Sequence, residues 1–309
     1  MTDLFHTKQT IYIVRHGVAD HNVMQLINGN GNSGTTGGGG GSSSPSYSHP
    51  NLLDPEYTDA RLTPRGRLQA QEAGRVIRSV LLDEAVTPLS TLSPLLLDAI
   101  ITSPLTRCLE TTKEMTEQIK IGSEFQGAAR QLGRWIVREE LREAHGIHFS
   151  DKRSPRSQLE LAWPNVDFQF ISEQDEDWRC DQRETVHDVN RRIDAFLHWL
   201  TWSELVQSQS QSSSQSSASN TDTGTCRQAS TCDINKDKTN SSSTCLVISH
   251  GVWMECLFKR YFPIIMEGGR RVYNCNVFRA IVESDWEKRD DAWQCHGINI
   301  SSVDLIHGE

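Results

Sequence analysis

Three short apolar runs constrain the fold of this 309-residue chain more than any other feature. They occupy residues 10–14, 99–102 and 245–249, and none of them alternates with charged residues. Continuous apolar runs of this length are typical of strands that are covered on both faces of a sheet. The sequence therefore predicts three buried strands.

Helix start signals separate these runs. Thr63 and Pro64 predict a helix that continues to about residue 82, since threonine can cap the first turn and proline fits its first position. The serine–proline pair at 103–104 repeats this signal and predicts a helix over residues 105–119.

A third helix is predicted to begin at Thr185, because Thr185 and Asp188 have the spacing of a capping box. Strands that alternate with helices in this way indicate an α/β fold. We expect a three-layer α/β/α sandwich with a mostly parallel central sheet.

Two segments depart from this pattern. Residues 29–49 are rich in glycine and serine, and residues 207–243 are rich in serine and glutamine. Such segments bury too little apolar area to offset the entropy of ordering the chain. We expect both to be disordered insertions in a single domain that spans residues 1–309; a phosphorylated regulatory loop is the alternative for the second.

Charge and composition exclude several partners. The net charge of −9 disfavours non-specific binding to nucleic acid or anionic lipid. The first residues lack a signal-peptide pattern, and no apolar run approaches membrane-spanning length. The eight cysteines lack the short paired spacings of a zinc module or a disulfide framework. We expect a soluble protein of the cytoplasm, with the nucleus as an alternative, and neither a nucleic acid nor a membrane as partner.

Polar residues that suit phosphate chemistry follow all three apolar runs. They are Arg15, His16 and Gly17 after the first run, Arg107 after the second, and His250 and Gly251 after the third. Because the carboxyl ends of parallel strands meet at one edge of a sheet, these residues are expected to lie together. An imidazole can attack phosphorus, and guanidinium groups and a helix N-terminus can bind the phosphoryl oxygens.

The order of these motifs resembles the histidine phosphatase superfamily, and within it the phosphoglycerate-mutase-like branch. The matching segments are residues 13–17 (IVRHG) with Asn22, residues 59–66 (DARLTPRG), residues 102–107 (TSPLTR) and residues 248–251 (ISHG). The resemblance covers the chain except the two insertions and about the last thirty residues.

This resemblance implies a role for each matching residue. His16 would form a phosphohistidine, and His250 would support it as a second catalytic histidine. The phosphoryl oxygens would be bound by Arg15, Asn22, Arg107 and Gly251. Val18 and Ala19 stand where the family's phosphoglycerate mutases usually have glutamate and serine, which weakens a mutase assignment.

The leaving group also needs a proton donor, because an alkoxide leaves poorly without one. The segment 139–146 resembles the part of the family that carries the acid, and Glu143 is our choice, with Glu140 in reserve. Since His250 is followed by glycine and not by aspartate, the acid arrangement of the histidine acid phosphatases is absent.

The residues after Glu143 resemble a segment of plant and fungal phosphoglycerate mutase-like proteins. Lys152, Arg153 and Arg156 could contact a second anionic group, although a solvated basic loop is the favoured interpretation. His145 and His148 make at best an incomplete metal site. We expect neither a metal nor another cofactor.

These observations favour an enzyme that hydrolyses a phosphomonoester of a small metabolite through a phosphohistidine. The alternatives are phosphoryl transfer of the phosphoglycerate mutase type and a non-catalytic phosphate-binding or scaffold protein. Because His16 must be neutral and Glu143 protonated, the activity is expected to be bell-shaped in pH.

Overall fold

The computed structural model describes residues 4–23, 53–84, 95–121, 124–125, 128–129, 131–217, 241–289 and 292–308. The segment 29–49 lies outside these ranges, so its expected disorder stays a prediction.

A mixed six-stranded sheet forms the centre of the molecule, in the order β5-β2-β6-β1-β7-β8. Its strands are β1 (Leu4–Arg15), β2 (Leu95–Thr102), β5 (Gln131–Val137), β6 (Ser241–Ser249), β7 (Val277–Arg289) and β8 (Ala292–His307). The four strands from β5 to β1 are parallel, whereas β7 and β8 are antiparallel to their neighbours. The three predicted strands are therefore the adjacent strands β2, β6 and β1 of a mostly parallel sheet.

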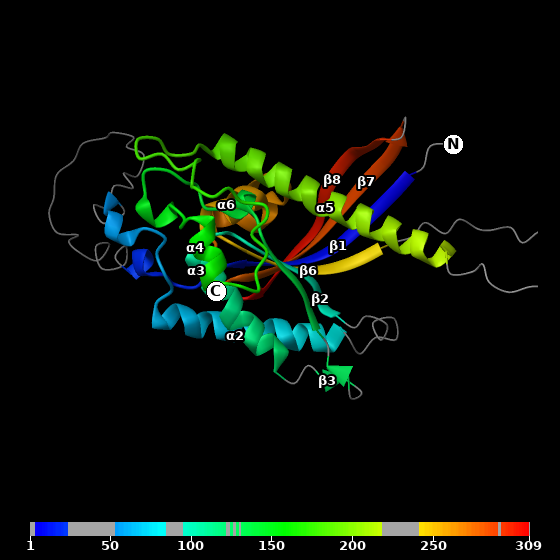
Figure 1. Ribbon diagram of the computed structural model, residues 1–309, viewed down its shortest axis with the longest axis horizontal. Coiled ribbons are helices and arrows are strands. Elements are labelled where there is room, and N and C mark those ends of the chain that lie inside the picture. The colour runs from blue at the N-terminus through cyan, green and yellow to red at the C-terminus, as the bar shows by residue number, and fades with distance from the viewer. Residues whose placement is uncertain are drawn as a thin grey trace, which may run out of the picture.

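Helices cover both faces of this sheet (Figure 1). The longer helices are α2 (Pro64–Glu84), α3 (Thr106–Lys120), α5 (Val186–Ser217) and α6 (Gly251–Tyr261). Helices α2 and α3 pack on one face, and α5 and α6 on the other. The expected three-layer α/β/α sandwich is confirmed.

Smaller elements lie in the segments between these strands and helices. They are α4 (Arg156–Ala162), the two-stranded sheet of β3 (Glu124–Phe125) and β4 (Ala128–Ala129), and the 3-10 turns η2 (Pro55–Tyr57), η4 (Glu139–Leu141), η5 (Phe149–Asp151) and η6 (Pro263–Gly269).

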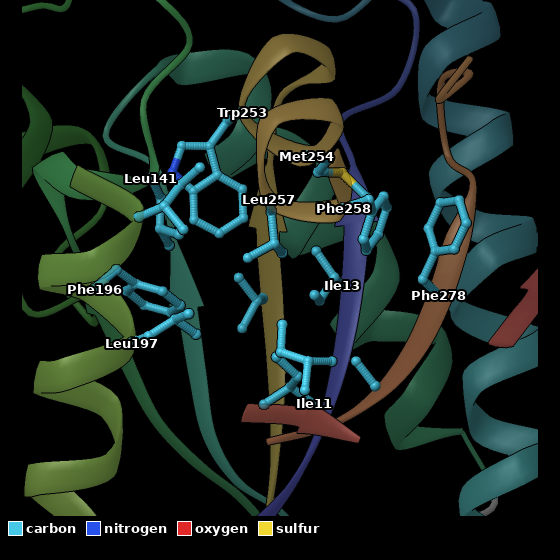
Figure 2. Packing of buried hydrophobic residues seen from close by; sticks show 14 of the residues in the cluster. Ile11, Ile13, Leu141, Phe196, Leu197, Trp253, Met254, Leu257, Phe258 and Phe278 are labelled. Atoms are coloured by element: carbon cyan, nitrogen blue, oxygen red, sulfur yellow. The ribbon is translucent and has the colours of Figure 1, made fainter. Parts of the chain in front are cut away.

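Buried hydrophobic residues form one cluster on each face of the sheet, and alternate side chains of β1 belong to the two clusters. Ile11 and Ile13 belong to the cluster under α5 and α6, and Tyr12 and Val14 belong to the cluster under α2 and α3. Figure 2 shows the first cluster, in which Phe196 of α5 and Leu257 of α6 lie over the sheet. Burying one such side chain stabilises the fold by about 1.5–3 kcal/mol. The two clusters fix the sheet between its helical layers.

Two of the three predicted helix starts are confirmed. Thr63 Oγ1 accepts a hydrogen bond from Gly66 N at 3.0 Å, next to Pro64, the first residue of α2. Thr185 and Asp188 form the capping box, with Asp188 N donating to Thr185 Oγ1 and Thr185 N to Asp188 Oδ2, both at 3.2 Å.

The start of α3 differs from the prediction. This helix begins at Thr106, and its N-cap residue, Leu105, makes no side-chain cap. Ser103 Oγ instead lies 2.8 Å from His250 Nε2. A carboxylate from a distant loop takes over the capping role, because Asp59 Oδ1 accepts a hydrogen bond from Thr106 N at 2.7 Å. Local pattern alone therefore misplaces this start by about one residue.

The serine- and glutamine-rich segment 207–243 is described only at its ends. Helix α5 continues to Ser217, and β6 begins at Ser241, so both ends have regular backbone structure. Residues 218–240 lie outside the described ranges, and for them disorder stays a prediction.

Candidate active site

The candidate site lies where β1, β2 and β6 end at one edge of the sheet. His16 follows the last residue of β1, and His250 follows the last residue of β6. These strands are hydrogen-bonded neighbours, and His16 N donates to Ser249 O at 3.0 Å. The two imidazole rings consequently lie with their centroids 5.0 Å apart. The structure brings together the two histidines that the sequence singles out.

The tautomer of His16 follows from its hydrogen bond. Its Nδ1 lies 2.8 Å from the carbonyl oxygen of Gly17, and a carbonyl can only accept. Nδ1 therefore carries the proton, and Nε2 keeps its lone pair. Burial, together with the positive charges of Arg107 and Arg15, lowers the pKa of His16 well below its usual range. The ring is held neutral, which is the form that attacks an electrophile.

The backbone beside His16 is tightly supported. Gly17 N donates to Thr111 Oγ1 at 3.1 Å, and Val18 N donates to Gln69 Oε1 at 3.1 Å. A Cβ atom on Gly17 would overlap the carbonyl oxygen of Gly66 in the first turn of α2. Only glycine permits this approach of two backbone segments.

Arg107 is the second residue of α3 and is completely buried. Its Nη1 donates to Ser150 O at 2.5 Å, and its Nη2 donates to Asp151 Oδ1 at 2.8 Å and to His250 Nδ1 at 3.2 Å. Among the residues that the structure describes, none forms a hydrogen bond with its Nε. A buried N–H group without a partner is costly, and an anion would satisfy it.

Arg15, the residue directly before His16, also has a buried Nε. Its Nη1 donates to Val272 O at 2.5 Å, and its buried Nε has no hydrogen-bond partner in the described ranges. The guanidinium group lies against Gly251, where a Cβ would approach Arg15 Cζ to 3.2 Å. The sequence-predicted residues Arg15, Arg107 and Gly251 are thus brought together around the two histidines.

His250 is the N-cap residue of α6 and is completely buried. Since Arg107 donates to its Nδ1, its proton resides on Nε2, which lies 2.8 Å from Ser103 Oγ and 3.3 Å from Cys108 Sγ. Burial and the charge of Arg107 lower the pKa of His250 well below its usual range. His250 is therefore a neutral ring that accepts a hydrogen bond from Arg107.

Glu143 faces the N-terminus of α6. Its Oε1 accepts from Ala144 N at 2.9 Å, and its Oε2 accepts from Val252 N at 3.3 Å. Burial, and next the negative charge of Asp151, raise the pKa of Glu143. Glu140, the reserve candidate, instead pairs with Arg138 through Oε2 at 3.0 Å. Burial and the charge of Asp151, and not the two accepted hydrogen bonds, are what favour the protonated form of Glu143, and its role as the acid stays a prediction.

Asn22 lies in the turn that follows His16, but protein contacts occupy much of its amide. Its Oδ1 accepts from Ala19 N at 3.0 Å, and its Nδ2 lies 3.1 Å from His21 Nε2. Because Nδ2 carries two hydrogens, one is left for a phosphoryl oxygen. The phosphate contact of Asn22 stays a prediction.

His21 is a site residue that the sequence reasoning missed. Its ring centroid lies 5.9 Å from that of His16, and burial together with the charge of Arg107 lowers its pKa to about 3. Asp151, Ser103 and Thr111 were missed as well. Asp151 falls inside a segment that the sequence did single out, but nothing in the pattern indicated its contact with Arg107.

The basic residues after Glu143 divide into different environments. Arg153 is buried and is bonded to Glu139 Oε1 at 2.6 Å and to Ser172 O at 2.8 Å, so it is not available for a substrate. Lys152 Nζ lies 4.8 Å from the centre of the Trp178 ring. Arg156 Nε lies 3.4 Å from Glu160 Oε1. The structure thus withdraws Arg153 from a possible second anion site, and a substrate contact by Lys152 or Arg156 stays a prediction.

His145 and His148 pair with carboxylates and not with each other. His145 Nε2 lies 3.6 Å from Glu184 Oε1, and His148 Nδ1 lies 3.7 Å from Asp151 Oδ2. Within the part of the chain that the structure describes, no three histidine, cysteine or carboxylate side chains are grouped as a metal site. Over the same ranges, no helix is long and apolar enough to cross a membrane.

Comparison with known proteins identifies the family. The model of the histidine phosphatase superfamily (branch 1) matches residues 55–211, about half of the chain. This chain belongs to that superfamily. The matched range contains Arg107 and Glu143, whereas His16 lies before it and His250 after it.

A curated relative is similar over a longer stretch. "Phosphoglycerate mutase-like protein 1" of Arabidopsis thaliana is 28% identical over 212 residues, which cover 63% of this chain and 64% of that protein. The alignment thus spans slightly less than two thirds of the relative.

Two solved structures align along most of the chain. The phosphoglycerate mutase from Bacillus anthracis str. Sterne has 14% identity and a TM-score of 0.45, with 94% of this chain and 92% of that chain covered. The ecdysone phosphate phosphatase from Bombix mori, in complex with tungstate, has the same identity, TM-score and coverage.

Proposed function

We propose that this protein hydrolyses the phosphomonoester of a small metabolite through a phosphohistidine at His16. One observation carries the proposal. The neutral His16 ring keeps its Nε2 lone pair, and within the described part of the chain the buried Nε atoms of Arg15 and Arg107 have no hydrogen-bond partner. A nucleophile with two unsatisfied cationic donors is what phosphoryl transfer requires of a protein.

The residues suffice for a balanced reaction. His16 Nε2 attacks phosphorus while the bond from phosphorus to the leaving oxygen breaks, and Glu143 gives its proton to that oxygen. Glu143, now a carboxylate, takes a proton from water as the water oxygen attacks phosphorus. The bond to Nε2 then breaks, which restores neutral His16 and protonated Glu143 and releases inorganic phosphate.

Both pKa shifts support these roles. The lowered pKa of His16 keeps the nucleophile neutral in slightly acidic solution, and the raised pKa of Glu143 keeps the acid protonated at higher pH than an exposed carboxyl. The activity is expected to rise with pH as His16 loses its proton and to fall as Glu143 loses its own.

The test is hydrolysis of a panel of small phosphomonoesters in the presence of a chelator, with acid-quench trapping of a phosphohistidine. We expect turnover and an acid-labile label for the wild type, and a loss of at least about 1,000-fold in kcat together with the label in His16→Ala. His187→Ala, which replaces an exposed histidine of α5, is the matched control and should retain both.

Two outcomes would contradict the proposal. Absence of turnover and of label on every ester would favour a phosphate-binding protein without activity. Conversion of 3-phosphoglycerate to its 2-isomer faster than release of phosphate would favour a mutase.

A further inference from the structure

Asp151 is a buried carboxylate that the proposed reaction does not use. It ends the turn η5 and is only 4% exposed. Its Oδ1 accepts from Arg107 Nη2 at 2.8 Å, and its Oδ2 accepts from Arg183 Nη1 at 3.2 Å and lies 3.7 Å from His148 Nδ1. Burying a carboxylate is expensive unless it is paired, and here positive or protonatable groups surround it.

The contacts of Arg107 determine where its remaining donor points. Ser150 O and Asp151 Oδ1 hold the two terminal nitrogens, and His250 Nδ1 shares one of them. Because a guanidinium group is planar, fixing both terminal nitrogens also fixes the direction of Nε. Of these three acceptors, Asp151 alone carries a negative charge, so its hydrogen bond is the strongest.

We propose that Asp151 is a positioning residue, whose carboxylate holds the Arg107 guanidinium in the orientation that presents Nε to the phosphoryl group. This inference rests on the proposed function. Asp151 acts through Arg107 and touches neither the substrate nor the reacting atoms.

The Asp151 carboxylate contacts a partly exposed arginine as well as the buried Arg107. Arg183 has a side chain that is 30% exposed, and its Nη1 also donates to Gly146 O at 3.0 Å. Asp151 thus lies between a buried arginine and a partly exposed one. A substitution of the partly exposed Arg183 can therefore change the charge next to Asp151 without disturbing the buried core.

The negative charge of Asp151 also affects the pKa of Glu143 electrostatically. The charged and titratable groups around Glu143 are Arg15, Arg107, Cys108, Asp151, Arg183 and Cys256. The negative charge of Asp151 raises the pKa of Glu143, and the positive charge of Arg183 lowers it. Burial raises the pKa of both thiols, so they stay neutral near pH 7. Changes at Asp151 and Arg183 should therefore shift the proton affinity of Glu143 in opposite directions.

A double-mutant cycle tests the positioning role. Asp151→Asn keeps the shape of the side chain and removes its charge, and we expect kcat for an aryl phosphate to fall about 10- to 100-fold. In an Arg107→Ala background the same change should lower kcat by less than about threefold, because the guanidinium group that Asp151 positions is absent. Equal losses in both backgrounds would overturn the proposal.

Asp175→Asn is the matched control for this cycle. Asp175 is another buried carboxylate of the same region, and it pairs with Arg142 Nη1 at 2.7 Å instead of a site residue. Its effect on kcat should be small and equal in both backgrounds. Circular dichroism and thermal unfolding of every variant establish which of them fold.

The pH profile provides a second test that does not depend on the folding of Asp151→Asn. In Arg183→Gln the alkaline limb of kcat/KM should move to higher pH, and in Asp151→Asn or Asp151→Ala it should move to lower pH. A merely structural role would move neither limb in this signed way. A limb that stays in place in Arg183→Gln, or that moves to lower pH, would overturn the electrostatic part of the inference.

Wild-type behaviour separates failure of this inference from failure of the proposed function. A wild type without turnover and without a label removes the proposed function itself. If the wild type shows both turnover and the label, but Asp151→Asn lowers kcat equally in the two backgrounds, only the positioning role of Asp151 is excluded.

Discussion

Gly17 and Gly66 set how closely the segment after His16 approaches α2. A Cβ on either glycine would overlap backbone atoms of the other segment. At the same place Thr63 Oγ1 donates to Val18 O at 2.9 Å, so a hydrogen bond reinforces the approach. Two residues without side chains thus position the backbone that carries the nucleophile.

Gly66→Ala should lower both stability and activity. The added methyl group must push Val18 and Gly17 away from α2, which should reduce the free energy of unfolding by about 1–3 kcal/mol. Because His16 Nδ1 is bonded to Gly17 O, kcat should fall as well. Urea unfolding and steady-state kinetics measure the two effects.

Two glycine variants serve as controls. Gly74→Ala crowds Met115 at the contact between α2 and α3, and should lower stability while leaving kcat of the folded enzyme unchanged. Gly297→Ala meets no atom within 4 Å and should change neither. A Gly66→Ala variant with unchanged kcat would show that the approach of these two segments matters for stability alone.

At the scale of elements, α3 depends on a residue outside itself for its N-terminus. Asp59 accepts from Thr106 N at 2.7 Å and Thr106 Oγ1 at 2.8 Å, and also from Ser154 N at 3.1 Å and Ser154 Oγ at 2.7 Å. Its φ of 52° is left-handed, a conformation that aspartate and asparagine adopt more readily than most residues. One carboxylate joins the loop before α2, the start of α3 and the chain after η5.

Asp59→Ala should be more damaging than Asp59→Asn. Alanine removes all four accepted hydrogen bonds and is strained at a positive φ, whereas asparagine keeps one acceptor and tolerates the backbone. Loss of a helix cap alone costs about 0.5–2 kcal/mol, and the further bonds add to it. Since Arg107 follows Thr106 directly, kcat should fall in the same order.

Asp54 provides the matched control in the same loop. It caps the short turn η2 through Glu56 N at 2.9 Å and is exposed. Asp54→Ala should change stability by less than about 0.5 kcal/mol and leave kcat intact. If Asp54→Ala and Asp59→Ala had equal effects, the special importance of the α3 cap would be refuted.

At the scale of the whole molecule, the buried histidines couple folding to pH. Burial lowers the pKa of His16, His21 and His250 in the folded protein, whereas an unfolded histidine titrates near about 6.5. Their contribution to stability is complete above that pH. It is lost as the pH falls below it, because the unfolded chain then binds protons that the folded chain does not.

The free energy of unfolding should therefore decrease as the pH falls from 6.5 to 5, by up to about 1.4 kcal/mol per pH unit for each of these histidines. Urea unfolding at several pH values measures this slope. His21→Gln should reduce it by the contribution of one histidine, and His187→Gln, at an exposed position on α5, should not. A slope that His21→Gln leaves unchanged would contradict this account.

The sequence predicted the layers, the three central strands and the two histidines at their ends. Apolar runs and helix start signals are local features of the chain, and parallel strands place their carboxyl ends at the same edge of the sheet. The sequence could not predict the partners of Arg107 and Thr106. Asp151 lies 44 residues from Arg107, and Asp59 lies 47 residues from Thr106, and both contacts depend on how loops pack once the sheet exists. The missing cap of α3 is the same case, since its local signal was present and the distant carboxylate replaced it.

The position of β6 between β1 and β2 has a consequence for the chain as it is synthesised. β1 and β2 are complete by residue 102, but the strand that separates them ends only at residue 249. At about 5–20 residues per second, roughly 7–30 s pass before that strand exists. Until then the edges of β1 and β2 that β6 covers in the folded protein have no strand partner, and an unpaired apolar edge can pair with another chain. A ribosome that stalls within this interval would release a product that has the nucleophile, lacks the centre of its sheet, and is prone to aggregate.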